Sequence, residues 1–456
     1  MRWRAFAWLV VAAAGCSKSS DPCAKAHPHG AMSWIADDLP GALACAKQRN
    51  QPVVLDLWAP WCHTCLSMQS TVFTDASFKA DAGKFVFAAL DTDREANAEA
   101  VAKYPPSAWP TFYVIAPDGA VLARFVGGAS KEQFHAFLDA GTRAMAGGAQ
   151  GPDGHLLTAE RALAAKDLTK ADTELRMALA RAPADWPRRP DALVSLINTK
   201  AKQGDKEACM GLAETDLDHT GSAASASDFL VIAMGCAEDM AKEPANAERV
   251  QALRERAVAR WRTLIDDANA PLSVDDRSDA MASMRETLDK LGKKDDAHAM
   301  AERQRALLDA DFAKAPTAMA RMTHIWPRAE VYVYLGRPLD LVADYQKLAT
   351  DLPKEYDPPA RLGWLYLKAG KLAEAATWTD KAIALAYGPR KARVLAQRAD
   401  IAQKAGDKAA ERRYREDIVK LWESLPPAQQ NPEALAKAKE ALADMDKPPP
   451  PAAASK

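Results

Sequence analysis

The hydrophobic pattern of the chain has its clearest feature at residues 53–57, a short and almost unbroken apolar block of the kind that forms a buried strand. The block contains a single acid, Asp56. A turn containing two tryptophans and a proline follows at 58–61. Residues 62–65, Cys-His-Thr-Cys, then stand where the pattern predicts the first turn of a helix. The sequence therefore predicts a strand, a turn and a helix with two cysteines at its start.

Similar apolar blocks recur between residues 85 and 126, and amphipathic stretches lie around them. Strands are predicted at 85–91, 112–115 and 121–126, and helices or helical pieces at 34–49, 77–80, 95–103 and 131–140. This mixture predicts an α/β domain over residues 34–143. A Gly-rich segment at 144–154 is typical of a flexible linker.

Beyond the linker, strand patterns almost vanish and amphipathic helices follow one another. Small residues, aromatic residues and a glycine turn within 359–385 resemble a tetratricopeptide helix pair, and similar turns recur along the chain. We therefore expect an all-α, TPR-like solenoid over residues 155–445. Its middle part, about 220–330, fits the repeat less well and could consist of plain helical hairpins. Residues 446–456 are predicted to be a disordered tail.

The start of the chain has the pattern of an export signal, with two arginines before an apolar run that is too short to span a bilayer. We assign residues 1–15 to this signal and 16–33 to a polar tether. The sequence Ala-Ala-Gly-Cys that ends at Cys16 resembles a bacterial lipobox. That resemblance implies a lipid on Cys16 and a protein anchored at a membrane of the cell envelope, in the periplasm or on the outer surface. An ordinary signal peptide or a plain N-terminal anchor remains an alternative.

Composition and charge narrow the range of functions. The formal net charge is −1, so there is no general attraction to nucleic acid. The sequence has no phosphate-binding GxxxxGK[ST], no HExxH and no GxSxG motif. No cofactor and no metal site are predicted.

Two cysteines one helical turn apart can form a reversible disulfide. The free N–H groups and the positive end of the helix dipole stabilise a thiolate there, and such cysteines have a pKa of about 3.5–7. A zinc site or a structural bridge is the alternative. Zinc needs a second pair of ligands, and the nearest candidates, His27 and His29, lie in the predicted tether. The strand–turn–helix context therefore favours redox chemistry.

This stretch resembles the thioredoxin superfamily, whose pattern is an apolar strand with an Asp, followed by Trp-Cys-x-x-Cys. Ala-Trp-Pro-Thr at 108–111 stands at the position of the family's cis-proline. The resemblance covers about residues 34–142 and is greatest to the C-terminal, periplasmic domain of DsbD-type thiol reductases. It implies a thiol:disulfide oxidoreductase whose redox disulfide joins Cys62 and Cys65.

The resemblance also assigns roles to single residues. Cys62 would attack, Cys65 would resolve the mixed disulfide, Asp56 would relay the proton of Cys65, and Pro110 would hold the backbone that pairs with a client. Four neighbours would shape the site: Trp61, His63, Thr64 and Trp109.

The residues between the cysteines, His63 and Thr64, replace the Gly-Pro of thioredoxin. A histidine beside Cys62 favours the thiolate, and thus a more oxidising disulfide. The lysine that often lies near the buried acid in this family is here Ala89. The redox direction stays open.

Four cysteines remain once Cys16, Cys62 and Cys65 are assigned. In an oxidising compartment two structural disulfides are plausible, Cys23–Cys45 and Cys209–Cys236. The alternative is that each of these cysteines is a small buried hydrophobe.

Client proteins with cysteines or disulfides are the expected partners, together with a membrane thiol-electron donor. A helical solenoid presents a surface that binds proteins, and four aromatic residues could be anchors there or inter-helix packing: Trp326, Tyr332, Tyr334 and Trp364. Two rival functions remain. One is an adaptor or chaperone-like scaffold in which redox chemistry is secondary, and the other is a thiol reductant for cytochrome maturation.

Overall fold

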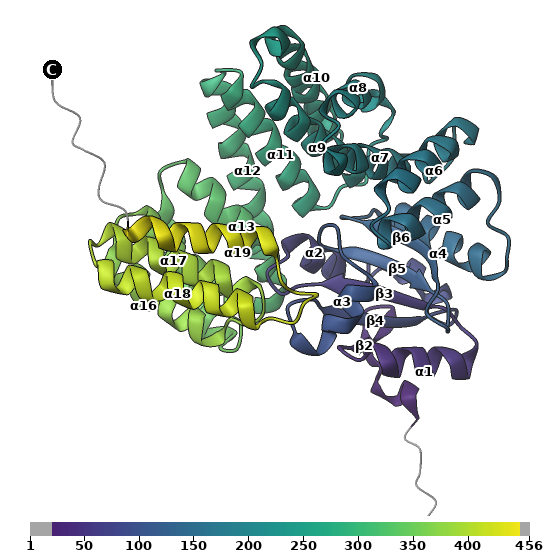
Figure 1. Cartoon of the computed structure of the whole chain (residues 1–456), viewed down its shortest axis with the longest axis horizontal. Helices are drawn as coiled ribbons and strands as arrows, with labels where there is room; N and C mark the ends of the chain where they lie inside the picture. Colours follow the sequence, from purple (N-terminus) through teal and green to yellow (C-terminus); the bar gives the residue numbers. More distant parts are fainter. Residues whose placement is uncertain (1–20, 447–456) are drawn as a thin grey trace, which may run out of the picture.

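The computed structural model describes residues 21–446. It consists of a sheet domain, residues 21–145, and a helical region, residues 151–446 (Figure 1). This confirms the predicted fold class, an α/β domain followed by an all-α region. The predicted export signal, Cys16 and all but the first residue of the predicted tail lie outside the described residues.

The sheet domain is built on six strands in the order β1-β2-β4-β3-β5-β6. The strands are β1 His27–His29, β2 Met32–Ala36, β3 Val53–Trp58, β4 Val86–Asp91, β5 Thr111–Ile115 and β6 Val121–Val126. Strand β3 lies parallel to β4 and antiparallel to β5. Because β3 is central, its first five residues are buried, as the apolar block predicted.

Helices cover both faces of this sheet. They are α1 Leu39–Arg49, α2 His63–Thr71, α3 Ala98–Lys103 and α4 Lys131–Met145, with 3-10 helices at Pro22–Lys25, Ala76–Ala80 and Glu95–Asn97. Helices α2 and α4 pack with Val54 and Phe112 on one face, while α1 packs with Val53 and Leu55 on the other. Side chains alternate along a strand, so Asp56 points to the same side as Val54, towards α2.

The first described residues differ from the predicted polar tether. Strand β1 pairs with β2, and a disulfide joins Cys23 to Cys45 of α1. The predicted helix at 34–49 is likewise corrected, because β2 pairs in parallel with β4 before α1 begins. The apolar residues of β2 were assigned to the wrong element, since their partners lie about 50 residues further along the chain.

The linker is also shorter than predicted. Helix α4 extends to Met145 and α5 begins at Gly151, with Pro152 in its first turn. Arg161 of α5 donates a hydrogen bond from Nε to the carbonyl of Val121 at 2.8 Å. The segment predicted as flexible therefore leads directly into a helix that packs on β6.

The helical region consists of helices joined mostly by short turns. They are α5 Gly151–Ala164, α6 Leu168–Arg181, α7 Arg189–Gln203, α8 Lys206–Asp216, α9 Ala224–Met240, α10 Ala247–Asp266, α11 Val274–Lys290, α12 Lys294–Lys314, α13 Ala318–Tyr334, α14 Val342–Asp351, α15 Asp357–Lys368, α16 Leu372–Leu385, α17 Arg390–Lys404, α18 Lys408–Ser424 and α19 Pro432–Ala443, with 3-10 helices at Leu217–His219, Pro244–Asn246, Pro338–Leu341 and Asp444–Asp446. Gly370, at the turn from α15 to α16, has a φ of +73°, a conformation that glycine adopts readily. No helix in residues 21–446 has the length and hydropathy needed to cross a bilayer.

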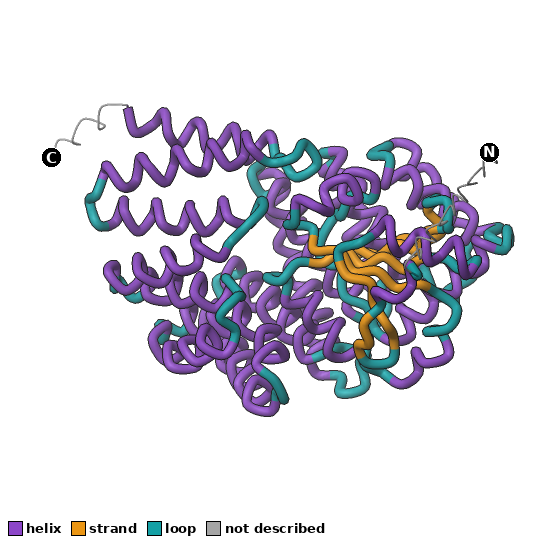
Figure 2. Tube along the Cα trace, turned by 90° about the horizontal axis from the view of Figure 1, so that it is seen from below, coloured by secondary structure: helices purple, strands orange, loops and turns teal. Residues whose placement is uncertain are grey.

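The helical region curves around the sheet domain instead of extending away from it. Helices α5 to α12 lie beside one part of the domain and α13 to α19 beside another, with α2 facing the array (Figure 1). Seen from below, the helices of the helical region lie next to the edge of the strand layer (Figure 2). Helix α2 contacts both α11 and α13.

Candidate functional site

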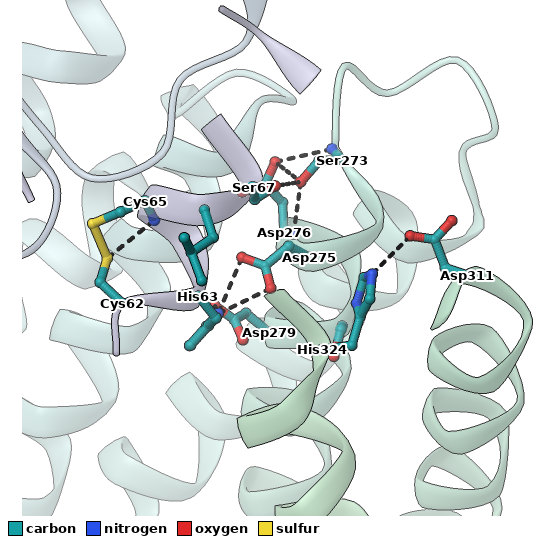
Figure 3. Close-up of polar contacts among 12 residues, drawn as sticks. Cys62, His63, Cys65, Ser67, Ser273, Asp275, Asp276, Asp279, Asp311 and His324 are labelled. Carbon is teal, nitrogen blue, oxygen red and sulfur yellow. Dashed lines mark hydrogen bonds and ion pairs between the residues drawn. A yellow bond between two sulfur atoms is a disulfide. The ribbon is translucent and has the colours of Figure 1, made fainter. Parts of the chain in front are cut away.

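The cysteine pair lies at the junction of β3 and α2, as predicted. Cys62 is the N-cap of α2, and its Sγ accepts a hydrogen bond from the backbone N–H of Cys65 at 3.0 Å. A disulfide joins the two residues, whose Cα atoms are 5.2 Å apart (Figure 3). Cys62 is 4% exposed and Cys65 is 1% exposed. The N–H that contacts Cys62 would also stabilise its thiolate after reduction.

Asp56 is buried, and its Oδ1 has no hydrogen-bond partner among the described residues. Burial raises the pKa of Asp56 to about 8. In the sheet it pairs with Ala89 on β4, the position where the family often has a lysine, and with Phe112 on β5. A carboxyl group with this pKa can accept and return a proton near neutral pH.

Two tryptophans and the cis-proline form one wall of the site. The Trp109–Pro110 peptide bond is cis. The indole of Trp61 donates a hydrogen bond to Oδ2 of Asp93 at 2.7 Å, and that of Trp109 donates to Oγ1 of Thr92 at 2.8 Å. The two rings meet edge to face, with their centroids 5.2 Å apart. The polar tip of each ring is thereby fixed, and the site has a rigid aromatic side.

His63 is held by the helical region. Its Nδ1 lies 2.9 Å from Oδ1 of Asp275 and 4.0 Å from Oδ2 of Asp279, both on α11 (Figure 3). Burial alone would lower the pKa of His63, but these two carboxylates raise it to about 10. The residue after Cys62 is therefore a cation at neutral pH.

The same three side chains could hold a metal ion, because their ligand atoms lie within 4.8 Å of one another. A protonated imidazole does not bind metals through its protonated nitrogen. The raised pKa of His63 therefore favours an ion pair over metal coordination.

The helical region also packs over the active-site turn. Trp61 packs against a hydrophobic cluster of α15 to α17, and Leu66 belongs to the core formed by α12 to α15. Thr64 is half-buried and lines cavities on both sides of α2. Apolar side chains of α2 and its turn are therefore inserted between helices of the array.

Hydrogen bonds from the C-terminal part of the helical region also hold the two parts of the chain together. Tyr387 donates its hydroxyl to Oδ2 of Asp91. The amide nitrogen of Gln429 donates to the carbonyls of Thr92 at 2.8 Å and Arg94 at 3.0 Å. These bonds hold residues about 300 positions apart in the sequence against the loop that supports Trp61 and Trp109.

Sequence reasoning did not single out five residues of the helical region that contribute to the site: Arg361, Arg390, Arg393, Asp275 and Asp279. The three arginines line a cavity beside Cys62, and the two acids contact His63. In the sequence they stand on charged faces of amphipathic helices and look like solvated positions. No local pattern indicates where these five side chains lie, because their place depends on packing between distant segments.

Most of the aromatic residues considered as protein-binding anchors pack against other side chains of the helical region. Trp326 and Trp364 have ring centroids 5.3 Å apart, and Tyr332 is buried with its hydroxyl on Asp309. Tyr334 is half-buried beneath the guanidinium of Arg285. Trp326 additionally lines the cavity beside Cys62.

The structure pairs the remaining described cysteines as the sequence favoured. Besides Cys23–Cys45, a disulfide joins Cys209 of α8 to Cys236 of α9. Both bridges lie in hydrophobic clusters away from the Cys62–Cys65 pair.

The fold and the site together define a thioredoxin-fold domain with a cysteine pair, followed by a long helical region. A family model described as a thioredoxin-like domain matches residues 39–142. Thioredoxin of Pseudomonas aeruginosa is 36% identical over 89 residues, which cover 20% of this chain and 78% of that protein. The chain belongs to the thioredoxin family through this domain.

Solved structures with tetratricopeptide repeats resemble the chain more distantly. A tetratricopeptide repeat protein from Parabacteroides merdae is 15% identical, with a TM-score of 0.42 over 65% of this chain and 99% of that one. The TPR2AB domain of yeast Sti1, in a complex with pHsp90, is 10% identical, with a TM-score of 0.23 over 65% and 98%.

Proposed function

We propose that this protein is a thiol–disulfide oxidoreductase of the cell envelope that acts through Cys62 and Cys65. The observation that carries the proposal is the disulfide at the start of α2, with the N–H of Cys65 directed at Sγ of Cys62. A protonated His63 beside it adds a positive charge that favours a thiolate.

In the reducing direction the thiolate of Cys62 attacks one sulfur of a client disulfide. The client S–S bond breaks, its other sulfur leaves as a thiolate, and a mixed disulfide forms. Cys65 then gives up its proton, for which Asp56 is the proposed acceptor, and attacks Sγ of Cys62. The second client thiolate leaves, and two electrons have passed from the protein dithiol to the client. The oxidising direction is the reverse of these steps.

The proposed location rests on the start of the sequence and on the cysteines. The apolar run before Cys16 supports export, and a lipid on Cys16 would hold the protein at a membrane. The pairs Cys23–Cys45 and Cys209–Cys236 suit an oxidising compartment, where disulfides persist. An electron donor in that membrane would keep the cysteine pair active in reduction.

A second candidate function is a scaffold that binds client proteins through its helical region. The burial of both redox cysteines favours it, because Cys62 is a residue only 4% exposed, and a folded client cannot reach it unless the cover opens. In that case the sheet domain would mainly be a docking unit.

Three variants of the full chain separate these functions. If the oxidoreductase proposal holds, Cys62→Ser abolishes exchange with a model disulfide, while Cys65→Ser accumulates mixed disulfides that gel electrophoresis without reductant detects. Exchange by Cys62→Ser at the rate of the parent would overturn the proposal. Retained client binding in a Cys62→Ser, Cys65→Ser double variant, with no exchange by the parent, would favour the scaffold.

A further inference from the structure

A cavity of about 250 Å³ lies directly beside Cys62, between the sheet domain and the helical region. The active-site turn, the cis-proline loop and helices α13, α15 and α17 all contribute to its walls. It is lined by Trp61, Cys62, His63, Thr64, Trp109, Trp326, Arg361, Arg390 and Arg393. The attacking sulfur is therefore reached through a space that the helical region completes.

Two of the three arginines are held in place by stacking on tryptophans. The guanidinium carbon of Arg361 is 4.3 Å from the ring centroid of Trp326, and that of Arg390 is 4.4 Å from the ring centroid of Trp61. Arg361 also bonds Asp357, with Nη2 at 3.0 Å from Oδ1. Planar guanidinium groups fixed in this way can bind a carboxylate through two parallel hydrogen bonds.

The described residues that line the cavity include three arginines and no carboxylate. Arg361 is paired with Asp357, and His63 is paired with Asp275 and Asp279, so the charges without a carboxylate partner are those of the other two arginines. Within residues 21–446, neither Arg390 nor Arg393 has a carboxylate within ion-pair distance. Burial, together with the charge of Arg361, lowers the pKa of Arg390. An anion in the cavity would relieve this repulsion.

The size of the cavity points to a small ligand. Its volume is near the lower end of small-molecule pockets, its walls come from both parts of the chain, and it is open to solvent on one side. The tryptophans offer apolar surface to a short aliphatic chain, and Trp109, 36% exposed, lies where the cavity meets solvent. A small ligand that fills this space would have room for a carboxylate near the arginines and a sulfur near Cys62.

We propose that the cavity binds a low-molecular-mass thiol or disulfide that carries carboxylates, and that this class of molecule exchanges with Cys62. The inference rests on the proposed function and names its substrate class. The Cys62 thiolate bonds to one sulfur of the small disulfide and one carboxylate-bearing thiolate leaves. Cys65 displaces the second, so the small disulfide is reduced by two electrons and the protein dithiol is oxidised. The protein dithiol is regenerated by a dithiol reductant.

The experiment uses the full chain, reduced beforehand with dithiothreitol, and three small disulfides of different charge. Oxidised glutathione is anionic, hydroxyethyl disulfide is neutral and cystamine is cationic. We expect the second-order rate constant for oxidation of the Cys62–Cys65 dithiol to fall in that order, and the preference for the anion to weaken as salt rises. Equal values for the three, or faster reduction of insulin than of any small disulfide, would overturn the inference.

Arginine variants test the cavity itself. Arg393→Gln and Arg390→Gln should each lower the ratio of this rate constant for oxidised glutathione over that for hydroxyethyl disulfide roughly tenfold, the usual worth of a charged hydrogen bond. Arg390→Lys should recover part of that loss. Arg413→Gln on α18 removes the same charge from an exposed position outside the cavity and should leave the ratio unchanged. An equal fall in Arg413→Gln, or no fall in the cavity variants, contradicts the proposed site.

Failure of this inference can be told from failure of the proposed function. If the parent exchanges none of the three disulfides, the oxidoreductase proposal is wrong. If it exchanges hydroxyethyl disulfide without preferring the anion, only the substrate class is wrong. Circular dichroism of each variant shows whether a fall in the ratio comes from misfolding. If Arg390→Gln misfolds, Arg393→Gln, which is at an exposed position, tests the cavity.

Discussion

Nδ1 of His63 lies 2.9 Å from Oδ1 of Asp275, which is 212 residues further along the chain. This pair connects the helix that carries the redox cysteines to helix α11 of the array. It also keeps a positive charge beside Cys62, because the carboxylates hold the imidazole protonated. The chemistry of the cysteine pair and the docking of the helical region thus share one side chain.

We expect His63→Gln to make the disulfide less oxidising. Without the cation the thiolate of Cys62 is less stable, and a rise of about one unit in its pKa corresponds to a potential lower by about 30 mV. Equilibration with thiol–disulfide buffers measures the potential. His135→Gln is the matched control, because His135 pairs with Asp81 away from the cysteines. A potential that moves equally in both variants would exclude the charge effect.

The His63–Asp275 pair should also make stability depend on pH. The pKa of His63 is about 10 in the folded protein and 6.5 in the unfolded chain, so the folded state holds the extra proton between these values. Its contribution is therefore complete below pH 6.5 and is lost as pH rises towards 10. We expect the parent to exceed His63→Gln by about 3 kcal/mol in unfolding free energy at pH 6.5, the lower range for breaking a buried pair.

Denaturant unfolding of both proteins at pH 6.5 and pH 10, with the disulfides intact, measures this difference. Groups away from His63 titrate equally in the two proteins, so the comparison isolates His63 together with Asp276 and Asp279, whose pKa values its charge lowers. A difference that is the same at both pH values would contradict the assignment of the charge to His63.

Asp56 should lower the stability of the folded protein and support disulfide exchange. Burial raises its pKa to about 8, so folding requires a proton that the unfolded chain releases above pH 3.8. The resulting loss of unfolding free energy is absent below pH 3.8 and grows as the pH rises to 8. Asp56→Asn should thus raise the unfolding free energy by about 2–4 kcal/mol at pH 7. It should also slow release of the mixed disulfide roughly 100-fold, because the proton acceptor of Cys65 is lost.

Asp228→Asn is the control for this experiment. The pKa of Asp228 is also raised to about 8, by burial and by the carboxylates of Asp276 and Asp279. It lies on α9 in the helical region. We expect Asp228→Asn to reproduce the pH-dependent gain in stability with no change in mixed-disulfide release. Slowing by both variants would mean that the effect is structural.

The two structural disulfides should contribute stability without affecting exchange. They close loops with sequence separations of 22 and 27 residues, for which loop entropy predicts about 3 kcal/mol each. Replacing Cys209 and Cys236 by Ala should lower the unfolding free energy by this amount, as measured in denaturant. The reduction potential of Cys62–Cys65 should stay the same. A changed potential would show that these cysteines exchange with the active pair.

Local sequence patterns were enough to predict the β3–α2 unit, the cysteine pair and the cis-proline, because their signals are contiguous. The glycine turn within 359–385 was predicted for the same reason, and Gly370 lies there between α15 and α16. Strand β2 was missed, since its pairing with β4 is not local.

The placement of the helical region could not be predicted. Leu66 reads as an ordinary core residue of α2, yet its contacts are with α12 to α15. Arg361 and Arg390 look like solvated charges until Trp326 and Trp61 are brought beneath them. Such contacts depend on how two folded surfaces fit together, and an amphipathic pattern records only that a face is buried, not what covers it.

Loosening the cover over the active site should increase access for large reagents. Gln429 anchors the end of the array to the carbonyls of Thr92 and Arg94, so Gln429→Ala removes two hydrogen bonds between the parts. At about 1 kcal/mol each, the open population should rise roughly tenfold or more. We expect reduced Cys62 to react correspondingly faster with a bulky maleimide reagent, whereas its reaction with the small reagent iodoacetamide changes less.

Gln430→Ala provides the matched control, because within residues 21–446 the side chain of Gln430 bonds only to the carbonyl of Leu425 in the same loop. It should leave both alkylation rates as in the parent. Acceleration confined to the bulky reagent and to Gln429→Ala would mean that the helical region gates Cys62 by size. Equal rates in parent and variant for both reagents would mean that the sulfur is reached without opening, through the cavity alone. The alkylation series therefore determines whether a protein client could be reduced by the closed form.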